Sequence, residues 1–471
     1  MAPAEAPVIV WFRRDLRLAD NPALARAART GRPVIPVYVL EQDLEIRPTG
    51  GAGRWWLDKA LRALTDGLDA VGARLVLRRG NAAETILALA QETGAHAVYW
   101  NRLYDAPEIA RDTRVKAILR DRDLEVESFN AALLNEPWAV KTGSGGAYQV
   151  FTAYWRAARG LVGHPDTPPA PERVAAPVTW PRSDRLSDWA LHPTSPDWSA
   201  GFSVWTPGEA GAQAALGRFV EQGLQGYSRA RDIPAEEGVS RLSPHLHWGE
   251  IGPRQVWRAV EAAAHRHAGL TADAEKFLAE LGWREFNHHL AFHRPDLPKT
   301  DFRPTFQGLT WRHDPDAFAA WTKGQTGYPI VDAGMRQLWT TGWMHNRVRM
   351  IVASFLVKDL LIDWREGEAW FWDTLVDADT ASNAGNWQWV AGCGADAAPF
   401  FRIFNPVLQG ERFDAGGAYV RRWVPELSDL PNDLIHKPWA AKPPPKDYPS
   451  PIVDHGVARK RALDAYAALK G

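Results

Sequence analysis

The first 130 residues alternate short, almost wholly apolar runs with longer segments of helical periodicity. The runs predict five strands at 8–12, 34–40, 74–78, 96–100 and 124–128, and the segments between them predict helices near 22–30, 53–72, 82–93 and 107–121. Strands that are apolar on both faces are typical of a parallel sheet covered by helices on both sides. The alternation therefore predicts a doubly wound parallel α/β domain over residues 1–132.

The pattern changes after that domain. Residues 133–205 contain proline-rich stretches without periodicity, such as PDTPPAPERVAAPVTWP, which predict a long interdomain linker lying over the surface. From residue 206 to about 440, apolar residues recur at i, i+3, i+4 and i+7, as in GPRQVWRAVEAAAHRH. We therefore assign residues 206–471 to an all-helical domain, so that the expected fold class is α/β followed by all-α.

Composition adds two constraints. The chain has 24 Trp against 10 Tyr, and this density indicates indoles that stack on flat ligands, line a pocket or carry electrons. Its 55 basic and 56 acidic residues nearly cancel, so no global field attracts nucleic acid or membrane. A local basic face is compatible with this balance.

The sequence also carries signals about its compartment. The single cysteine, Cys393, excludes an internal disulfide and fits a reducing environment. The start MAPAEAP has no signal-peptide pattern, and no apolar run reaches the roughly 18 residues that span a bilayer. We therefore expect a soluble, cytoplasmic protein.

One segment has the character of a phosphate-binding turn. In GVSRLSPHLHWG, the residues Ser240, Arg241 and Ser243 precede a helix, where hydroxyls, backbone N–H groups and a guanidinium suit a phosphate group. The alternative is an ordinary helix start, with Ser243 as the N-cap and Pro244 at the first helical position. The sequence leaves both open.

A second segment, ELGWREFNHHL, places Glu280 and Trp283 on one helical face. A buried carboxylate beside an indole could bind the carbonyl of a flat ring. The alternative is a salt bridge between Glu280 and Arg284, four residues apart, with Trp283 in the core. Spacing does not separate the two interpretations.

A third segment, WMHNRVRM, holds Asn346, Arg347 and Arg349 within strongly apolar flanks, so these polar groups should be buried and paired. Asp377 and Asp379 in VDAD are the candidate partners, which predicts a charge-paired pocket. The histidines nearby lack a regular spacing with carboxylates, so we expect no metal site.

In chain order, these segments resemble the DNA photolyase/cryptochrome family, and specifically class I cyclobutane pyrimidine dimer photolyases. The resemblance covers residues 8 to about 440 and rests on WFRRDLRLADNPAL, GGAYQVFTAYWRA, YSRARDIPAEEGVSRLSPHLHWGEI, ELGWREF, TGYPIVDAGMRQLWTTGWMHNRVRM, ASFLVKDLLIDWREGEAWFW, ASNAGNWQWVAGCGADAAPFFRIFNPVLQG and YVRRWVPEL. It implies a light-driven repair enzyme with noncovalent FAD in its helical domain. The photoexcited, reduced FAD gives an electron to a dimer flipped out of the DNA.

The resemblance also implies roles for single residues at the cofactor. The matching set is Tyr227, Val239, Ser240, Arg241, Leu242, Ser243, Arg284, Arg349, Asp377, Asp379 and Asn383. Val239 stands where the family usually has Thr, so one hydroxyl toward the phosphates is missing. Asn383 matches the residue that faces the redox nitrogen of the flavin, where plant cryptochromes tend to carry Asp.

Substrate residues follow in the same way. The wall against the dimer matches Glu280, Trp283, Asn346, Met350 and Trp389, with Glu280 as the hydrogen-bonding group and the two tryptophans packed on the bases. Contacts to the DNA backbone match Arg231, Arg347, Arg402 and Gln409. A three-tryptophan chain that reduces oxidised FAD in light matches Trp387, Trp364 and Trp311. The expected partner is DNA containing pyrimidine dimers, bound by a monomer.

The antenna chromophore of the family, held between the domains, is less determined. Glu108 favours 5,10-methenyltetrahydrofolate over 8-hydroxy-deazaflavin. Pro107 and Leu297 depart from the folate-binding pattern. An empty or different antenna site therefore stays open.

Three alternative functions agree less well with the sequence. A cryptochrome-type photoreceptor is disfavoured by Asn383 and by the lack of a long tail after RRWVPEL. A photolyase for the (6-4) lesion normally has a His pair where this chain has a single His345. An NAD-type oxidoreductase is excluded because the first βα turn, RRDLRLADNP, has no G-x-G-x-x-G.

Overall fold

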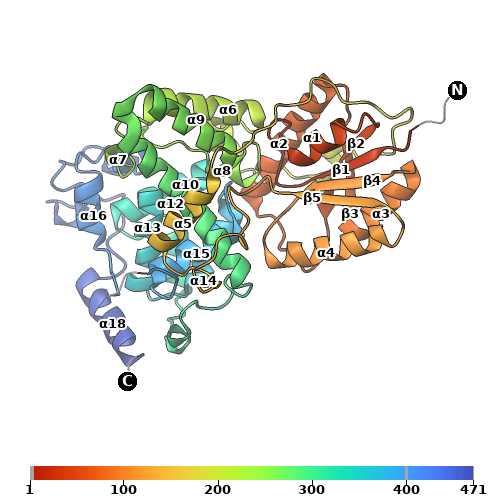
Figure 1. The fold of residues 1–471 in the computed structure, drawn as a ribbon. Helices are drawn as coiled ribbons and strands as arrows, with labels where there is room; N and C mark the ends of the chain where they lie inside the picture. The colour runs from red at the N-terminus through yellow and green to blue at the C-terminus, as the bar shows by residue number, and fades with distance from the viewer. Residues whose placement is uncertain (1–4, 398–400, 470–471) are drawn as a thin grey trace.

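The N-terminal domain is built on a five-stranded parallel sheet (Figure 1). In the computed structural model, which describes residues 5–397 and 401–469, the strands follow the order β3-β2-β1-β4-β5. They are β1 (Val8–Phe12), β2 (Val34–Glu41), β3 (Val76–Gly80), β4 (Ala97–Asn101) and β5 (Glu125–Phe129). All neighbouring strands are parallel, which confirms the doubly wound α/β fold. β3 begins two residues later than expected and β4 and β5 one residue later, and pairing with the long β2 carries β3 through Arg78 and Arg79 to Gly80.

Helices cover both faces of this sheet. They are α1 (Pro22–Ala28), α2 (Gly51–Ala70), α3 (Ala82–Thr93) and α4 (Ala106–Arg120). Alternate residues of β1 enter two separate cores: Val8, Val10 and Phe12 pack with α1 and α2, whereas Ile9 and Trp11 pack with α3 and α4. The period of two along a strand thus explains why every position of β1 is apolar.

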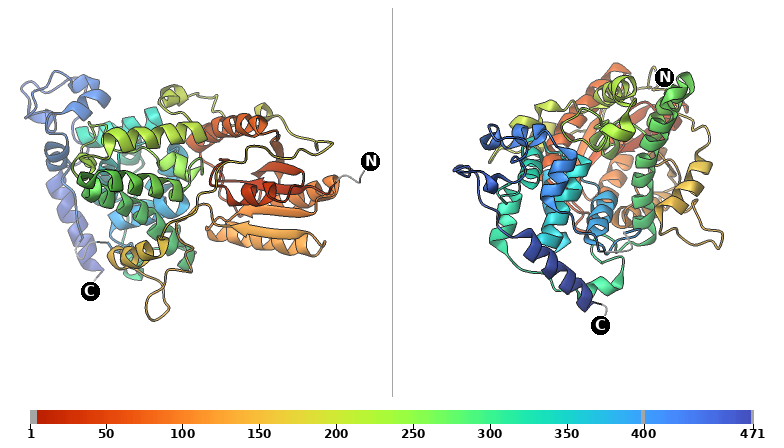
Figure 2. Two further views of the ribbon diagram at one scale, coloured as in Figure 1. Left: turned by 45° about the horizontal axis from the view of Figure 1, so that its top comes forward. Right: turned by 90° about the vertical axis from the view of Figure 1, so that its left-hand side faces the viewer.

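The second domain is helical, as expected, and its C-terminal helix lies at the end of the molecule opposite the sheet (Figure 2). Its helices are α6 (Glu209–Arg218), α7 (Tyr227–Ala230), α8 (Ser243–His247), α9 (Pro253–Arg266), α10 (Thr271–His293), α11 (Pro315–Thr322), α12 (Pro329–Thr341), α13 (Asn346–Ser354), α14 (Trp364–Thr374), α15 (Thr380–Ala391), α16 (Pro406–Phe413), α17 (Ala418–Trp423) and α18 (His455–Ala468). None of the helices within the described ranges is long and apolar enough to cross a membrane.

The segment predicted as a linker contains a helix. α5 (Phe151–Val162) lies between two irregular stretches and packs on α10. The contact is close because Gly282 has no side chain: a β-carbon there would come within 2.4 Å of the Trp155 indole. By its packing, α5 therefore belongs with the helical domain.

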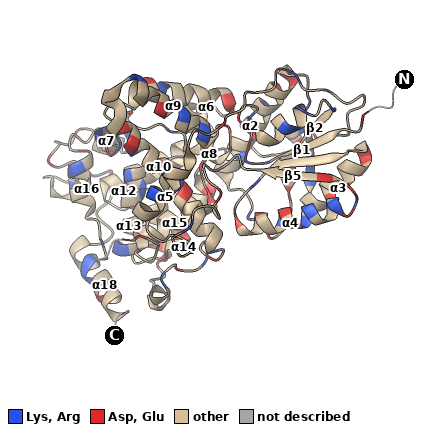
Figure 3. Cartoon of the chain, viewed as in Figure 1, with Lys and Arg blue, Asp and Glu red and all other residues tan. Residues whose placement is uncertain are grey.

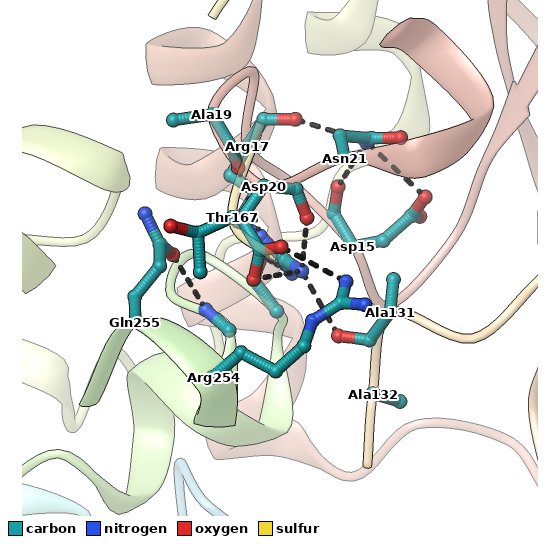
Figure 4. A network of polar contacts seen from close by, with 12 residues as sticks. Asp15, Arg17, Ala19, Asp20, Asn21, Ala131, Ala132, Thr167, Arg254 and Gln255 are labelled. Atoms are coloured by element: carbon teal, nitrogen blue, oxygen red, sulfur yellow. Dashed lines mark hydrogen bonds and ion pairs between the residues drawn. The ribbon is translucent and has the colours of Figure 1, made fainter. Parts of the chain in front are cut away.

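Arg17, in the loop after β1, fastens the two domains together (Figure 4). Its guanidinium is fully buried and donates hydrogen bonds to the carbonyls of Asp20 (2.7 Å), Ala131 (2.9 Å) and Gly249 (2.9 Å). The Asp20 carboxylate pairs in turn with Arg254 of α9 at 2.9 Å. One side chain thus joins the first loop, the chain leaving β5 and the helical domain, with its buried charge satisfied by acceptors.

Glu285 of α10 holds the start of the linker. Its buried carboxylate accepts hydrogen bonds from the backbone N–H groups of Leu134 (2.8 Å) and Asn135 (3.2 Å). Burial raises the pKa of Glu285 to about 7, against an ordinary value of 4.5. A proton is therefore kept on Glu285 at pH values where the unfolded chain has released it.

We expect Glu285→Gln to flatten the pH dependence of stability. Between the two pKa values the folded protein holds one more proton, so its free energy of unfolding falls as pH rises, by up to about 3 kcal/mol. The variant lacks this decline. Urea unfolding of both proteins at about pH 5 and about pH 8 measures it. The control is Glu275→Gln. Glu275 lies on α10 like Glu285, but it is exposed and pairs with Arg159 of α5. A wild-type slope in Glu285→Gln would contradict the assignment.

Candidate cofactor and substrate site

A buried ion pair lies at the centre of the helical domain. Asp377, whose side chain is 3% exposed, receives two hydrogen bonds from Arg349 at 3.1 and 2.8 Å. Arg349 also donates to the carbonyl of Met344 at 2.8 Å, and the Ser243 hydroxyl donates to Asp377 at 2.6 Å. This bidentate geometry fixes the planes of both groups. Of the charge-paired pocket predicted from WMHNRVRM and VDAD, the structure has the pair of Arg349 and Asp377.

The Ser240–Ser243 turn reaches the same place. Arg241 has φ +52°, a left-handed conformation that lets the chain turn sharply into α8. Its guanidinium pairs with Glu237 at 3.1 Å and lies over the ring of Trp343. Ser243 does not act as an N-cap, because its hydroxyl is used on Asp377 and α8 has no side-chain cap. The ordinary helix-start interpretation therefore does not describe Ser243.

Two further residues of the predicted cofactor set flank that turn. Tyr227 is buried at the first residue of α7, between Phe219 and Phe277, with the guanidinium of Arg231 over its ring. Val239 is half-buried and packs against the core of the N-terminal domain. It contributes an apolar surface and no hydroxyl, whereas Leu242 is fully buried.

Asn383 has a fixed amide orientation. Its Nδ2 donates to the backbone carbonyl of Glu368 at 3.0 Å and to the Glu368 carboxylate at 2.8 Å, which leaves Oδ1 as the acceptor end. Glu368 is held by a bidentate pair with Arg47 from the N-terminal domain, at 2.7 and 3.0 Å, and Arg47 lies over Trp372. Sequence reasoning missed this support. Glu368 could have been found as an acidic residue within the apolar helix REGEAWFW. Nothing in the sequence around Arg47 indicates its role.

Asp379 lies at the N-terminus of α15 beside two histidines. Its carboxylate accepts the N–H of Ser382 at 2.7 Å, with His247 at 3.8 Å and His288 at 3.6 Å. Burial lowers the pKa of both histidines, so they are neutral at neutral pH. Nδ1 of His247 and both ring nitrogens of His288 are buried without a hydrogen-bond partner among the described residues. Such unsatisfied atoms are what a polar ligand would complete.

Glu280 takes partners other than the one that spacing suggested. Its carboxylate pairs with Arg231, in a short contact, and with Lys276 at 3.4 Å. Arg284 instead donates to the carbonyl of Ala132 at 2.8 Å, toward the linker. The alternative of a salt bridge between Glu280 and Arg284 is therefore not what the structure has.

The arginines expected at the DNA are partly neutralised. Arg231 and Arg347 share Asp232, at 3.8 and 2.8 Å, so that Glu280, Arg231, Asp232 and Arg347 form a row of alternating charge. Figure 3 shows both signs of charge spread over both domains. Among the remaining predicted contacts, Asn346 and Arg402 are exposed, Gln409 is half-buried on α16, and Met350 lies with its sulfur 3.8 Å from Arg347 Nη1.

The two substrate tryptophans are half-buried, and defined contacts hold each of them. The Trp283 ring stacks on Phe151, with centroids 3.9 Å apart and planes within 9°. Trp389 donates its indole N–H to the carbonyl of Asp396 at 3.1 Å. Each contact restricts the indole while leaving part of it accessible.

The tryptophans of the predicted electron chain lie in or against one core. Trp387 is buried against Gly367, where a β-carbon would lie 2.2 Å from its ring. Trp364, one turn before Gly367 on α14, is buried and donates to Asp301 at 2.8 Å, and Trp311 is half-buried on the same cluster. The nearest rings to Trp387 are Phe371 at 5.0 Å and Trp321 at 6.3 Å, which the sequence did not indicate.

Comparison with known proteins agrees with this geometry. The family profile described as DNA photolyase matches residues 8–172, and the one described as the FAD binding domain of DNA photolyase matches residues 277–468. The deoxyribodipyrimidine photo-lyase of Agrobacterium fabrum is 54% identical over 100% of this chain and 99% of its own length. The chain belongs to the DNA photolyase/cryptochrome family.

Other members of the photolyase/cryptochrome family match as widely. The crystal structure of a bacterial class III photolyase from Agrobacterium tumefaciens superimposes with a TM-score of 0.96, at 54% identity, over 100% of both chains. Cryptochrome-1 of Arabidopsis thaliana is 38% identical over 98% of this chain and 70% of its own length. The matched FAD-binding domain contains Arg349, Asp377 and Asn383, and the Ser240–Ser243 turn precedes it in sequence.

Proposed function

We propose that the protein is a deoxyribodipyrimidine photo-lyase that splits cyclobutane pyrimidine dimers in DNA in light. The observation that carries the proposal is the fixed, neutral amide of Asn383, whose Oδ1 points away from its anchor Glu368. A reduced flavin has an N–H at its redox nitrogen, which an amide oxygen accepts without adding charge. For the subgroup, we propose class III in place of the class I expected from motifs, because the similar Agrobacterium tumefaciens protein is a class III photolyase.

The chain's own residues would hold FAD in the centre of the helical domain. Arg349 and Asp377 orient its ring system, Ser240 and Arg241 reach its phosphates, and the unsatisfied nitrogens of His247 and His288 accept or donate beside Asp379. When bound in its reduced form, FAD supplies the light-released electron that splits the dimer and then takes it back. Asp377 is buried, whereas a quarter of the Arg349 side chain stays exposed.

Glu280, Trp283 and Trp389 would receive the flipped dimer. Glu280 hydrogen-bonds its base edge, and the two half-buried indoles pack on its rings. Arg347, Arg402 and Gln409 contact the DNA backbone, an electrostatic contribution that depends on salt rather than on sequence. The protein acts as an intracellular monomer on DNA in this proposal.

We expect Glu280→Gln to lower the repair yield per absorbed photon several-fold while FAD stays bound. The change removes the negative charge that Arg231 and Lys276 hold in place, and it weakens the hydrogen bond to the dimer. Single-turnover repair of bound substrate measures the yield. Glu275→Gln, on the same helix but paired with the exposed Arg159, is the matched control and should repair normally. Equal yields in the two variants would remove Glu280 from the reaction.

For the antenna, we propose 5,10-methenyltetrahydrofolate over 8-hydroxy-deazaflavin. Arg13, at the carboxyl end of β1, where doubly wound domains bind flat ligands, forms a buried pair with Asp112 of α4 at 2.8 Å. Glu108 is paired with Arg14 at 2.5 Å, so a folate would share that contact. Chromatography of the chromophores released by acid would identify the antenna.

The proposal is tested with an oligonucleotide that carries one defined thymine cyclobutane dimer. Reduced holoprotein should repair it in blue light and leave it unchanged in darkness. A cryptochrome would bind and photoreduce FAD without repair. Repair of a (6-4) lesion instead is disfavoured by His345, whose Nδ1 accepts the N–H of Arg347.

A further inference from the structure

Phe151, the first residue of α5, lies directly behind one of the two substrate tryptophans. Its ring is parallel to that of Trp283, with centroids 3.9 Å apart. This stack covers one face of the indole, so a base can stack only on the other face. Phe151 belongs to the segment GGAYQVFTAYWRA, none of whose residues is in the predicted cofactor or substrate sets.

The same residue is also connected to the second tryptophan. The backbone N–H of Phe151 donates to the Asp396 carboxylate at 3.3 Å, and the Asp396 carbonyl accepts the indole N–H of Trp389 at 3.1 Å. Asp396 has φ +52°, so its left-handed backbone turns the carbonyl and the carboxylate toward different partners. Two hydrogen bonds therefore link Phe151 to Trp389.

Phe151 itself is held firmly in position. Its ring contacts Phe286 edge-on at 5.9 Å and lies parallel to Trp155 at 6.3 Å. Trp155 lies against Gly282, which sets α5 close to α10. Phe151 also borders a surface pocket of about 600 Å³ that residues of α5 line, and its side chain is half-buried.

We propose that Phe151 is a positioning residue for dimer repair. Its ring fixes the plane of Trp283, and its N–H fixes Trp389 through Asp396, so that the two indoles keep a set relative orientation for the flipped dimer. This inference rests on the proposed function. Its physical basis is preorganisation: binding a rigid, flat lesion loses less entropy when the stacking rings are already held.

The test compares Phe151→Ala with Phe151→Tyr. Phe151→Ala should raise the Kd for duplex carrying one thymine dimer by about two- to tenfold, the range of an aromatic pair, with no change for the same duplex without the dimer. Phe151→Tyr keeps the ring and should bind like wild type. Leu161→Ala, at an exposed position of α5, is the control. FAD content and photoreduction should be normal in all of them.

A double-mutant cycle separates positioning from general stability. In a Trp283→Ala background, Phe151→Ala should cause no further loss of lesion binding, because the ring that it orients is gone. Additive losses, equal weakening toward both duplexes, or failure of Phe151→Tyr to bind like wild type would overturn the proposal.

A second variant covers the case in which Phe151→Ala does not fold. Asp396→Ala removes the carboxylate that accepts the Phe151 N–H, so it breaks the link between Phe151 and Trp389 without removing a ring. It should raise the Kd for lesion DNA alone. An unchanged Kd would overturn this half of the proposal. If wild-type protein neither binds nor repairs the dimer, the proposed function fails; if wild type repairs and the variants match it, only the positioning role fails.

Discussion

Replacing Trp387 with Phe is expected to abolish the photoreduction of oxidised FAD and to spare repair by chemically reduced enzyme. Electron transfer between rings falls steeply with distance, and phenylalanine is much harder to oxidise than tryptophan. In the electron path that the family resemblance implies, Trp387 is the tryptophan nearest the flavin, and it packs against Gly367, one turn after Trp364. The change in flavin absorbance under blue light measures photoreduction.

The control for this variant is Trp138→Phe. Trp138 is an exposed tryptophan that contacts Tyr104 and Phe292, outside the core that holds Trp387. It should photoreduce at the wild-type rate and repair normally. Normal photoreduction in Trp387→Phe would show that electrons reach the flavin by a route that avoids this residue.

Replacing Arg349 with Ala is expected to release FAD and to lower the free energy of unfolding by about 3–5 kcal/mol. The reason is the Asp377 carboxylate, which is buried and would keep only the Ser243 hydroxyl as a partner. A buried charge without its counter-ion is costly whichever ligand occupies the site. Flavin content after gel filtration and urea unfolding of the apoprotein measure the two effects.

Two further variants sharpen this prediction. Arg349→Lys keeps the charge but loses the bidentate geometry, so it should retain part of the FAD. Arg336→Ala breaks a pair with Glu426 at 2.7 Å that is partly exposed, and it should bind FAD normally with a far smaller loss of stability. Full flavin content in Arg349→Ala would show that the ion pair is not needed to hold FAD.

Much of the fold could be predicted because a strand that is buried on both faces is apolar at almost every position. β1 is an example, with Val8 and Ile9 in different cores. The helix α5 was not predicted, although its buried residues Tyr154, Ala158 and Val162 recur every four positions. The proline-rich stretch after it indicated an irregular linker for the whole segment. Local patterns predict where an element lies only when the neighbouring residues do not carry a stronger signal.

One ion pair of the candidate site could be predicted from the sequence, but the partners of its other residues could not. Motifs placed Arg349 and Asp377 in one pocket, and the structure pairs them. Glu280 instead pairs with Arg231, which is 49 positions away in the sequence, and not with Arg284 on its own helix. Arg47 and Phe151 act across domains or between helices, where no local spacing exists to find them. Such long-range pairs follow from packing and so need the folded chain.

The contacts of Arg17 also limit which parts could be exchanged between relatives. A chimaera that joined this N-terminal domain to another helical domain would need a carbonyl where Gly249 offers one. It would also need glycine at position 252, since a β-carbon there would lie 2.1 Å from the Asp20 carboxylate. The acceptors of Arg17 are main-chain carbonyls, so a graft that misplaced them could not be corrected by exchanging side chains at those positions.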